Sequence, residues 1–146
     1  MKNLLKKILK YRTITREDGE PYLTRYYIFR KPFKWMPSIY IHCFHSSDTD
    51  VELHGHPWGH SISFILKGSY LEEYRVGDLV KTRILSPGMF NYIPANKYHR
   101  IDLQDKEVWT LFISGAKPKY DTWYFWNRDT KEYWDWRDHN QMKSKH

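Results

Sequence analysis

Three histidines stand close together in the chain, immediately before an apolar run. They are His54, His56 and His60, in the segment 53–68, which reads LHGHPWGHSISFILKG. Side chains two positions apart lie on the same face of a β-strand, so an unbroken strand would place all three on one face. Neutral imidazole binds Zn, Fe, Ni and Cu ions. The spacing therefore predicts a metal-binding face, and His99, in the segment IPANKYHRIDL, is a fourth candidate ligand.

Five further residues near these histidines are candidates for a pocket or for catalysis. His42, Trp58 and Tyr70 are expected to line a pocket, although a packed histidine is the plainer interpretation of His42. Glu72 is the carboxylate nearest to the cluster in sequence and the first candidate for acid–base catalysis; the alternative is a solvated charge in a hairpin. Tyr92, on a neighbouring strand, is the second catalytic candidate.

The bulk properties limit the elements that can hold these residues. The 146 residues, 18% of them aromatic, are the size of one folded domain, which we expect to span 1–146. Cys43 is the single cysteine and is expected to be a buried core thiol. No run reaches the roughly 18 apolar residues of a membrane span. The basic segment 1–12 lacks the features of a secretory signal, which favours a cytoplasmic location.

The order of patterns along the chain predicts an all-β protein. Within 1–12, residues 2–10 alternate as a short amphipathic helix, with leucine and isoleucine on one face and lysine on the other. Eight to ten short apolar or β-branched segments follow, with Gly, Pro or Asp turns between them. We expect a barrel core over 38–115 and a disordered tail over 139–146. This pattern favours an all-β sandwich or barrel.

The histidines and turns resemble the two motifs of the cupins. The first cupin motif begins with H-x-H and ends on a glycine, as do His54–His56 and Gly68 here. The second runs Gly, five residues, Pro, and four residues to His, which Gly88, Pro94 and His99 match. The resemblance implies a double-stranded β-helix (jelly-roll) barrel, here with a short N-terminal helix.

The departures from the cupin motifs concern the metal site. The glutamate of the first motif is absent: a three-residue gap puts His60 in its place, and a four-residue gap puts Ser61 there. The strand parity described above favours His60 as the inward-facing residue. The middle glycine of the second motif is Asn96, which tolerates a turn conformation, and its final asparagine is Leu103.

The resemblance implies a divalent transition metal, Fe, Zn, Ni or Mn. His54, His56 and His99 would form a three-histidine face similar to the iron centre of thiol and diketone dioxygenases, with His60 as an additional ligand. The wider layout is similar to compact single-domain cupins of bacteria and phages, for which the location would be the cytoplasm of the bacterium or host. Relatives of this kind are often homodimers.

Three functions remain open at this point. The first is a metal-dependent cupin that acts on a small molecule by an oxygen-dependent or Lewis-acid reaction. The alternative is a non-catalytic cupin that binds or sequesters an anionic ligand, such as a nucleotide or sugar phosphate, which the net charge of +7 favours. The third is nucleic-acid binding through the N-terminal helix and the aromatic C-terminal segment around Arg128 and Lys131. Packing of those aromatic residues on the β-core is the plainer interpretation, so nucleic acid is disfavoured.

Overall fold

The computed structural model describes residues 1–30, 33, 35–115, 123–135 and 137–138 of the chain. These contain one α-helix of more than one turn and twelve strands. The helix is α1 (Lys2–Ile8), and the strands are β1 (Tyr11–Thr15), β2 (Pro21–Phe29), β3 (Ser38–Phe44), β4 (Leu53–His54), β5 (His60–Lys67), β6 (Tyr70–Val76), β7 (Leu79–Leu85), β8 (Phe90–Pro94), β9 (His99–Leu103), β10 (Val108–Ser114), β11 (Tyr124–Trp126) and β12 (Tyr133–Asp135).

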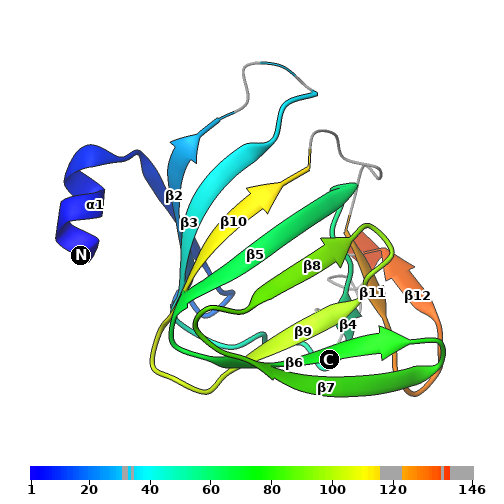
Figure 1. Ribbon diagram of the computed structural model, residues 1–146. Coiled ribbons are helices and arrows are strands. Elements are labelled where there is room, and N and C mark those ends of the chain that lie inside the picture. The colour runs from blue at the N-terminus through cyan, green and yellow to red at the C-terminus, as the bar shows by residue number, and fades with distance from the viewer. Residues whose placement is uncertain (31–32, 34, 116–122, 136, 139–146) are drawn as a thin grey trace.

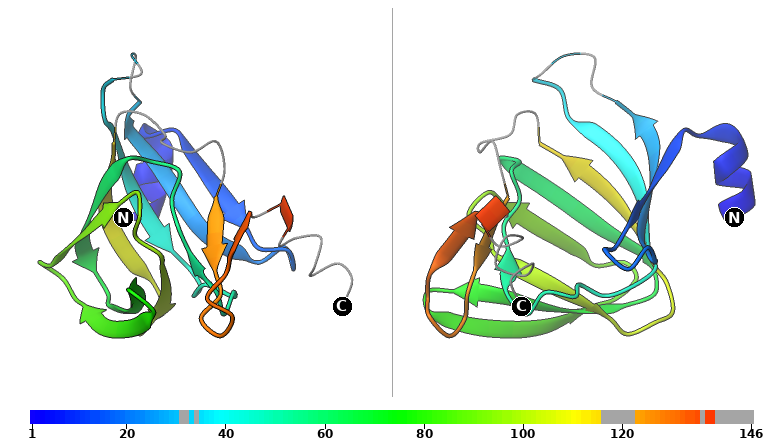
Figure 2. Two further views of the ribbon diagram at one scale, coloured as in Figure 1. Left: turned by 90° about the vertical axis from the view of Figure 1, so that its right-hand side faces the viewer. Right: turned by 180° about the vertical axis from the view of Figure 1, so that it is seen from behind.

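The strands form two antiparallel six-stranded sheets that curl around a common interior (Figures 1 and 2). One sheet has the order β1-β2-β3-β10-β5-β8, and the other has the order β12-β11-β4-β9-β6-β7. Strands distant in sequence are neighbours in both sheets: β10 lies between β3 and β5 in the first, and β4 lies beside β9 in the second. The class predicted from the sequence, an all-β jelly-roll barrel, is confirmed.

Alternation along β5 shows why the sequence forms a two-sided strand. Its small polar and β-branched residues at odd positions, Ser61, Ser63 and Ile65, are buried, whereas the residues between them are exposed. A period of two is that of a strand with one face on the interior. Ile65 belongs to a core cluster with Tyr70, Leu85, Ile101 and Val108. The inward face of β5 thus contributes directly to the hydrophobic core.

The N-terminal segment differs from the prediction in its extent. The helix ends at Ile8, Leu9 is already extended, and Tyr11–Thr15 pairs with β2 as the edge strand β1. The aromatic and β-branched residues of that strand explain the change, because they favour an extended backbone. Leu5 and Leu9 pack against the core residues Tyr26, Cys43 and Trp109, so the helix covers the barrel. The predicted disordered tail, 139–146, lies outside the described residues.

The connection between β5 and β6 depends on Gly68. Its φ is +73°, and a Cβ placed there would lie 2.3 Å from the carbonyl oxygen of Glu107. Only glycine combines this backbone angle with so close an approach. The turn sets where β6, and with it Glu72, enters the sheet. No helix in the described part of the chain is long and apolar enough to cross a membrane.

Candidate metal centre and pocket

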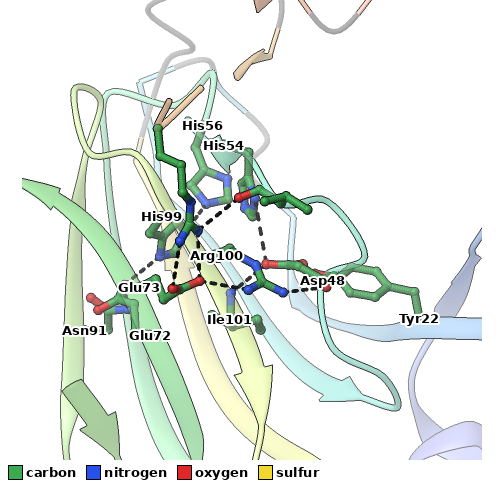
Figure 3. A network of polar contacts seen from close by, with 12 residues as sticks. Tyr22, Asp48, His54, His56, Glu72, Glu73, Asn91, His99, Arg100 and Ile101 are labelled. Atoms are coloured by element: carbon green, nitrogen blue, oxygen red, sulfur yellow. Dashed lines mark hydrogen bonds and ion pairs between the residues drawn. The ribbon is translucent and has the colours of Figure 1, made fainter. Parts of the chain in front are cut away.

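Three of the predicted histidines meet at one point inside the barrel (Figure 3). The ring centroids of His54, His56 and His99 form a nearly equilateral triangle with sides of 5.0 to 5.1 Å. One nitrogen from each ring lies within 4.8 Å of the other two. His99 is buried and the other two are half-buried. The arrangement places one nitrogen from each of three imidazole rings around a common centre.

Backbone pairing brings these histidines together from distant parts of the sequence. The two-residue strand β4 pairs with β9 through His54 opposite His99. On the other side of β4, Phe125 of β11 pairs with His54, and the amide of Gly55 donates to the carbonyl of Tyr124. His56 follows in the loop between β4 and β5. The cluster is therefore held by strands from three separate regions of the chain.

The contact between His56 and His99 tests whether the residues suit a metal ion. Their Nε2 atoms lie 2.8 Å apart. Two nitrogens bound at right angles to one ion, each about 2.1 Å from it, would be about 3 Å apart. The Nδ1 atom of His56 is buried without a hydrogen-bond partner among the described residues, so the ring is oriented by its Nε2 contact. The donor set fits a first-row transition ion.

Asp48 and burial set the state of His54. The Nδ1 atom of His54 faces the carboxylate of Asp48 at 3.8 Å, which leaves Nε2 for the cluster. Asp48 is fixed by the hydroxyl of Tyr22 at 2.5 Å and by the amide of Ile101 at 2.7 Å. Burial lowers the pKa of His54 to about 4, although the charge of Asp48 opposes this. Burial also lowers the pKa of His56 well below its usual value. Both rings are neutral at pH 7, the form that binds metals.

Glu72 orients His99 from behind. Its Oε1 atom lies 2.6 Å from His99 Nδ1, 2.7 Å from Lys97 Nζ and 2.7 Å from Asn91 Nδ2, and its Oε2 accepts from Arg83 at 2.8 Å. The side chain of Glu72 is fully buried. Burial favours the neutral acid, but the hydrogen bond from His99 and the charges of His99 and Lys97 outweigh it and lower the pKa of Glu72 well below its usual range. An ionised carboxylate only accepts, so His99 donates from Nδ1, which leaves Nε2 as the ring nitrogen that faces the cluster.

This environment changes the role predicted for Glu72. The sequence suggested a catalytic acid or base, and strand parity suggested that the residue faces inward. It does face inward, but four donors engage its carboxylate and keep it ionised. A group in that state holds no proton to give, so we assign Glu72 to positioning His99.

His60 and Tyr92 lie away from the histidine cluster. They stand on the exposed face of β5 and β8, where their rings stack at 5.8 Å and the hydroxyl of Tyr92 lies 2.5 Å from His60 Nδ1. The parity extended from His54 to His60 was wrong, because residues 55–59 form a loop and β5 begins only at His60. Ser61, the alternative at the cupin glutamate position, is the residue that faces inward. The cluster therefore lacks a carboxylate at that position.

The three predicted pocket residues line one cavity with the histidine cluster. Its volume is about 920 Å³, and His42, Trp58 and Tyr70 all contribute to its wall. The ring of Trp58 stacks on the ring of His56 with centroids 5.5 Å apart. The ring of Trp123, from the segment 123–135, contacts the same histidine ring edge-on at 5.0 Å. Such a cavity has the size and aromatic lining of a small-molecule site.

A second group of metal-binding side chains, Cys43, His45 and Glu107, lies outside this cavity. The ammonium group of Lys2 is in contact with the carboxylate of Glu107. Burial raises the pKa of Cys43 to about 11, so the thiol is protonated. A lysine therefore already neutralises the one carboxylate, and this group is a weak site for a further cation.

Sequence reasoning missed several residues that matter in the site. The sequence alone assigns no role to Asp48, Asn91, Lys97 or Arg25. Lys97 has only a weak signal, its place two residues before His99, because β9 begins at His99 and strand parity does not extend to Lys97. Asp48 and Arg25 have none, since only the sheet order brings them to the cavity.

Solved structures with a similar fold include iron enzymes. The structure of Fe(II)-HppE with the alternative substrate (S)-1-HPP superposes with a TM-score of 0.60 at 12% identity, over 74% of this chain and 56% of that chain. The hydroxypropylphosphonic acid epoxidase from S. wedmorenis gives a TM-score of 0.56 at 12% identity, over 72% and 55%. HEPD from Streptomyces albus, with 2-hydroxyethylphosphonate and Fe(II) bound, gives 0.61 at 11%, over 79% and 26%.

These likenesses show that the fold is cupin-like. This chain spans just over half of the length of the epoxidase chains and about a quarter of the HEPD chain. Neither a family model nor a curated protein sequence matches this chain.

Proposed function

We propose that this protein binds a divalent transition metal through His54, His56 and His99 and presents it to a small molecule in the adjoining cavity. The single observation that carries the proposal is the triangle of imidazole rings, whose centroids lie 5.0 to 5.1 Å apart. The iron-bound HppE and HEPD structures, which have a similar fold, favour iron among Fe, Zn, Ni and Mn. When bound, the ion would supply Lewis acidity and open positions for a ligand or for oxygen.

The protein's own residues would prepare this site. Glu72 and Asp48 orient His99 and His54, so that a nitrogen of each ring faces the centre. Trp58 and Trp123 cover His56 with apolar surface, which limits the access of water. A site with three fixed ligands and an apolar wall leaves its remaining positions to a ligand from the cavity. We propose oxygen-dependent chemistry there.

A non-catalytic binding function is the second candidate, and the state of Glu72 favours it. Its carboxylate is buried, ionised and engaged by four donors, so it has no proton to give as an acid. Under this function the protein would hold an anionic ligand without changing it. The cytoplasmic location and the homodimer stay predictions from the sequence.

Metal analysis tests the proposal directly. Protein purified without a histidine tag or chelator, then incubated with Fe(II) under argon and desalted, should carry about one iron per chain by mass spectrometry. His99→Ala should carry less than a tenth of that amount. His60→Ala is the matched control, because its ring lies on the outer face, and it should retain the full amount. Wild-type protein without stoichiometric iron, zinc, nickel or manganese would refute the proposal.

Oxygen consumption separates catalysis from binding. Iron-loaded protein is mixed with a panel of small organic acids and phosphonates in an oxygen electrode, and His99→Ala is run beside it. Consumption that depends on both the acid and His99 supports catalysis. An acid that shifts the melting temperature but is recovered unchanged, without oxygen uptake, supports the binding function.

A further inference from the structure

The cavity contains a second polar site, built on Arg25. Arg25 of β2 and His42 of β3 stand opposite each other in register, and both line the cavity. The Nε atom of Arg25 donates to His42 Nε2 at 3.0 Å, and its guanidinium lies over the ring of Tyr40, 4.9 Å from the centroid. These two contacts fix the plane of the guanidinium. Its two terminal nitrogens therefore present a rigid fork.

His42 is held neutral beside this arginine. It is 97% buried, and its ring stacks with the rings of Tyr40 at 5.8 Å and Phe112 at 4.8 Å. Burial, and then the charge of Arg25, lower its pKa well below the usual value. Because Nε2 accepts the hydrogen bond from Arg25, the proton of the neutral ring is on Nδ1. His42 thus adds a neutral donor next to a fixed cation.

Arg25 has no carboxylate partner among the described residues, unlike most arginines of this structure. The other arginine that lines the cavity, Arg16, is paired with Asp18 at 2.6 Å. Asp48, which also lines the cavity, is occupied by the hydroxyl of Tyr22 and by the backbone amide of Ile101. A half-buried guanidinium without a counter-ion, on the wall of a largely apolar cavity, is a site that an anion would stabilise.

We propose that Arg25 and His42 bind the oxyanion group, carboxylate or phosphonate, of an organic acid whose other end reaches the three histidines. Only the contact between the other end of the ligand and the three histidines rests on the proposed function; the oxyanion site does not. From His42 to His56 the wall runs through Phe112 and Trp58, in ring contacts of 4.8, 5.7 and 5.5 Å. An acid that spans this wall carries its anionic group several bonds away from the atoms at the histidines. The arginine site thereby selects ligands by charge and length.

Nuclear magnetic resonance on the metal-free protein tests the arginine site by itself. Methylphosphonate and acetate, the two smallest probes of the oxyanion chemistry, are titrated into labelled protein. We expect methylphosphonate to shift the Arg25 Nε–H resonance strongly and the indole resonance of Trp58 only slightly. The same affinity is expected in His54→Ala/His99→Ala protein, because those rings are not part of this site. If acetate alone binds, the ligand is a carboxylic acid; if methylphosphonate alone binds, it is a phosphonate or phosphate ester.

Two substitutions decide the outcome. Arg25→Gln should weaken binding of the anion about tenfold or more, since a charge-assisted hydrogen bond is lost. Arg25→Lys keeps the charge but not the two-pronged geometry of the guanidinium, so it should retain part of the affinity. It is the variant to measure if Arg25→Gln folds poorly. Lys81→Gln, on the exposed strand β7, is the control for loss of one positive charge. Binding that is unchanged in both arginine variants, or that is lost in the histidine double variant, overturns the proposal.

Loss of metal binding and loss of anion binding are thus separate results. A protein that takes up no metal but binds methylphosphonate through Arg25 refutes the proposed function and leaves the arginine site standing. A protein that binds iron while neither anion shifts the Arg25 resonance refutes the arginine site alone.

Discussion

Replacing Glu72 by glutamine is the sharpest perturbation of the histidine cluster. The change keeps the shape of the side chain but removes a buried charge that Lys97 and Arg83 neutralise. Lys97 is only 10% exposed, so it would be left as a poorly solvated cation. Breaking a buried ion pair in this way costs about 3 to 5 kcal/mol. For a domain of this size that is a decrease of roughly 10 to 16 °C in melting temperature.

The same substitution should lower metal affinity by a separate route. Glutamine can present its amide NH₂ to His99 Nδ1, which would favour the wrong tautomer and place a proton on Nε2. Removing the partner of a metal-binding histidine typically costs 10-fold to 100-fold in affinity. Glu72→Gln should therefore lose metal at a free concentration at which wild type is saturated, as measured by competition with a chromophoric chelator.

A double variant separates stability from orientation. Glu72→Gln with Lys97→Met removes both charges, so most of the lost stability should return while the weaker metal affinity remains. Glu73→Gln is the control, since Glu73 is next in sequence but pairs with Arg100 and Arg128 away from the cluster. If the double variant recovers wild-type metal affinity together with stability, Glu72 does not orient His99, and the reasoning is refuted.

Three further predictions follow from other parts of the structure. Because the pKa of His54 falls from 6.5 to about 4 on burial, the unfolded chain binds more protons between these values. His54 alone should then contribute about 2 to 3 kcal/mol to the fall in the free energy of unfolding of metal-free protein between pH 7 and 4.5, as measured by urea titrations. The fall should be smaller by about that amount in His54→Gln, and equal falls would contradict this. Gly68→Ala should cost about 3 kcal/mol, because it adds a clash with the carbonyl of Glu107 to an unfavourable φ, whereas Gly77→Ala, where the added Cβ meets nothing within 4 Å, should cost only about 1 kcal/mol; similar losses in the two would argue against the clash. Asp48→Asn should weaken metal binding about tenfold in the chelator assay without loss of the fold, and unchanged affinity would remove Asp48 from the site.

The fold could be predicted from the sequence because its signal is local and repeated. Short β-branched segments with Gly, Pro and Asp turns recur over most of the chain, and each one indicates a strand independently of the others. The C-terminal end of the helix was predicted less accurately, because Tyr11 and Arg12 continue the amphipathic pattern of residues 2–10 although they belong to β1. Edge strands carry weak alternation, because neither of their faces is fully buried.

The site was less accessible to sequence reasoning, for a topological reason. His54 and His99 meet because β4 pairs with β9, and a motif with fixed spacings carries that information. His60 was misplaced because parity holds only within one strand, and five residues of loop precede β5. Asp48 and Arg25 reach the cavity through strand neighbours that no local pattern specifies.

The shortness of β4 also affects how the cluster can open. His54 stands in a two-residue strand whose outer neighbour is the hairpin of β11 and β12, anchored by the fully buried Trp126. Separation of this hairpin would free the β11 side of His54 while the strands β3, β10 and β5 stay paired. Local openings of this kind need less free energy than global unfolding. The lifetime of an ion held by His54 is then governed by the hairpin, and amide hydrogen exchange at Gly55 and Trp126 would report its opening rate.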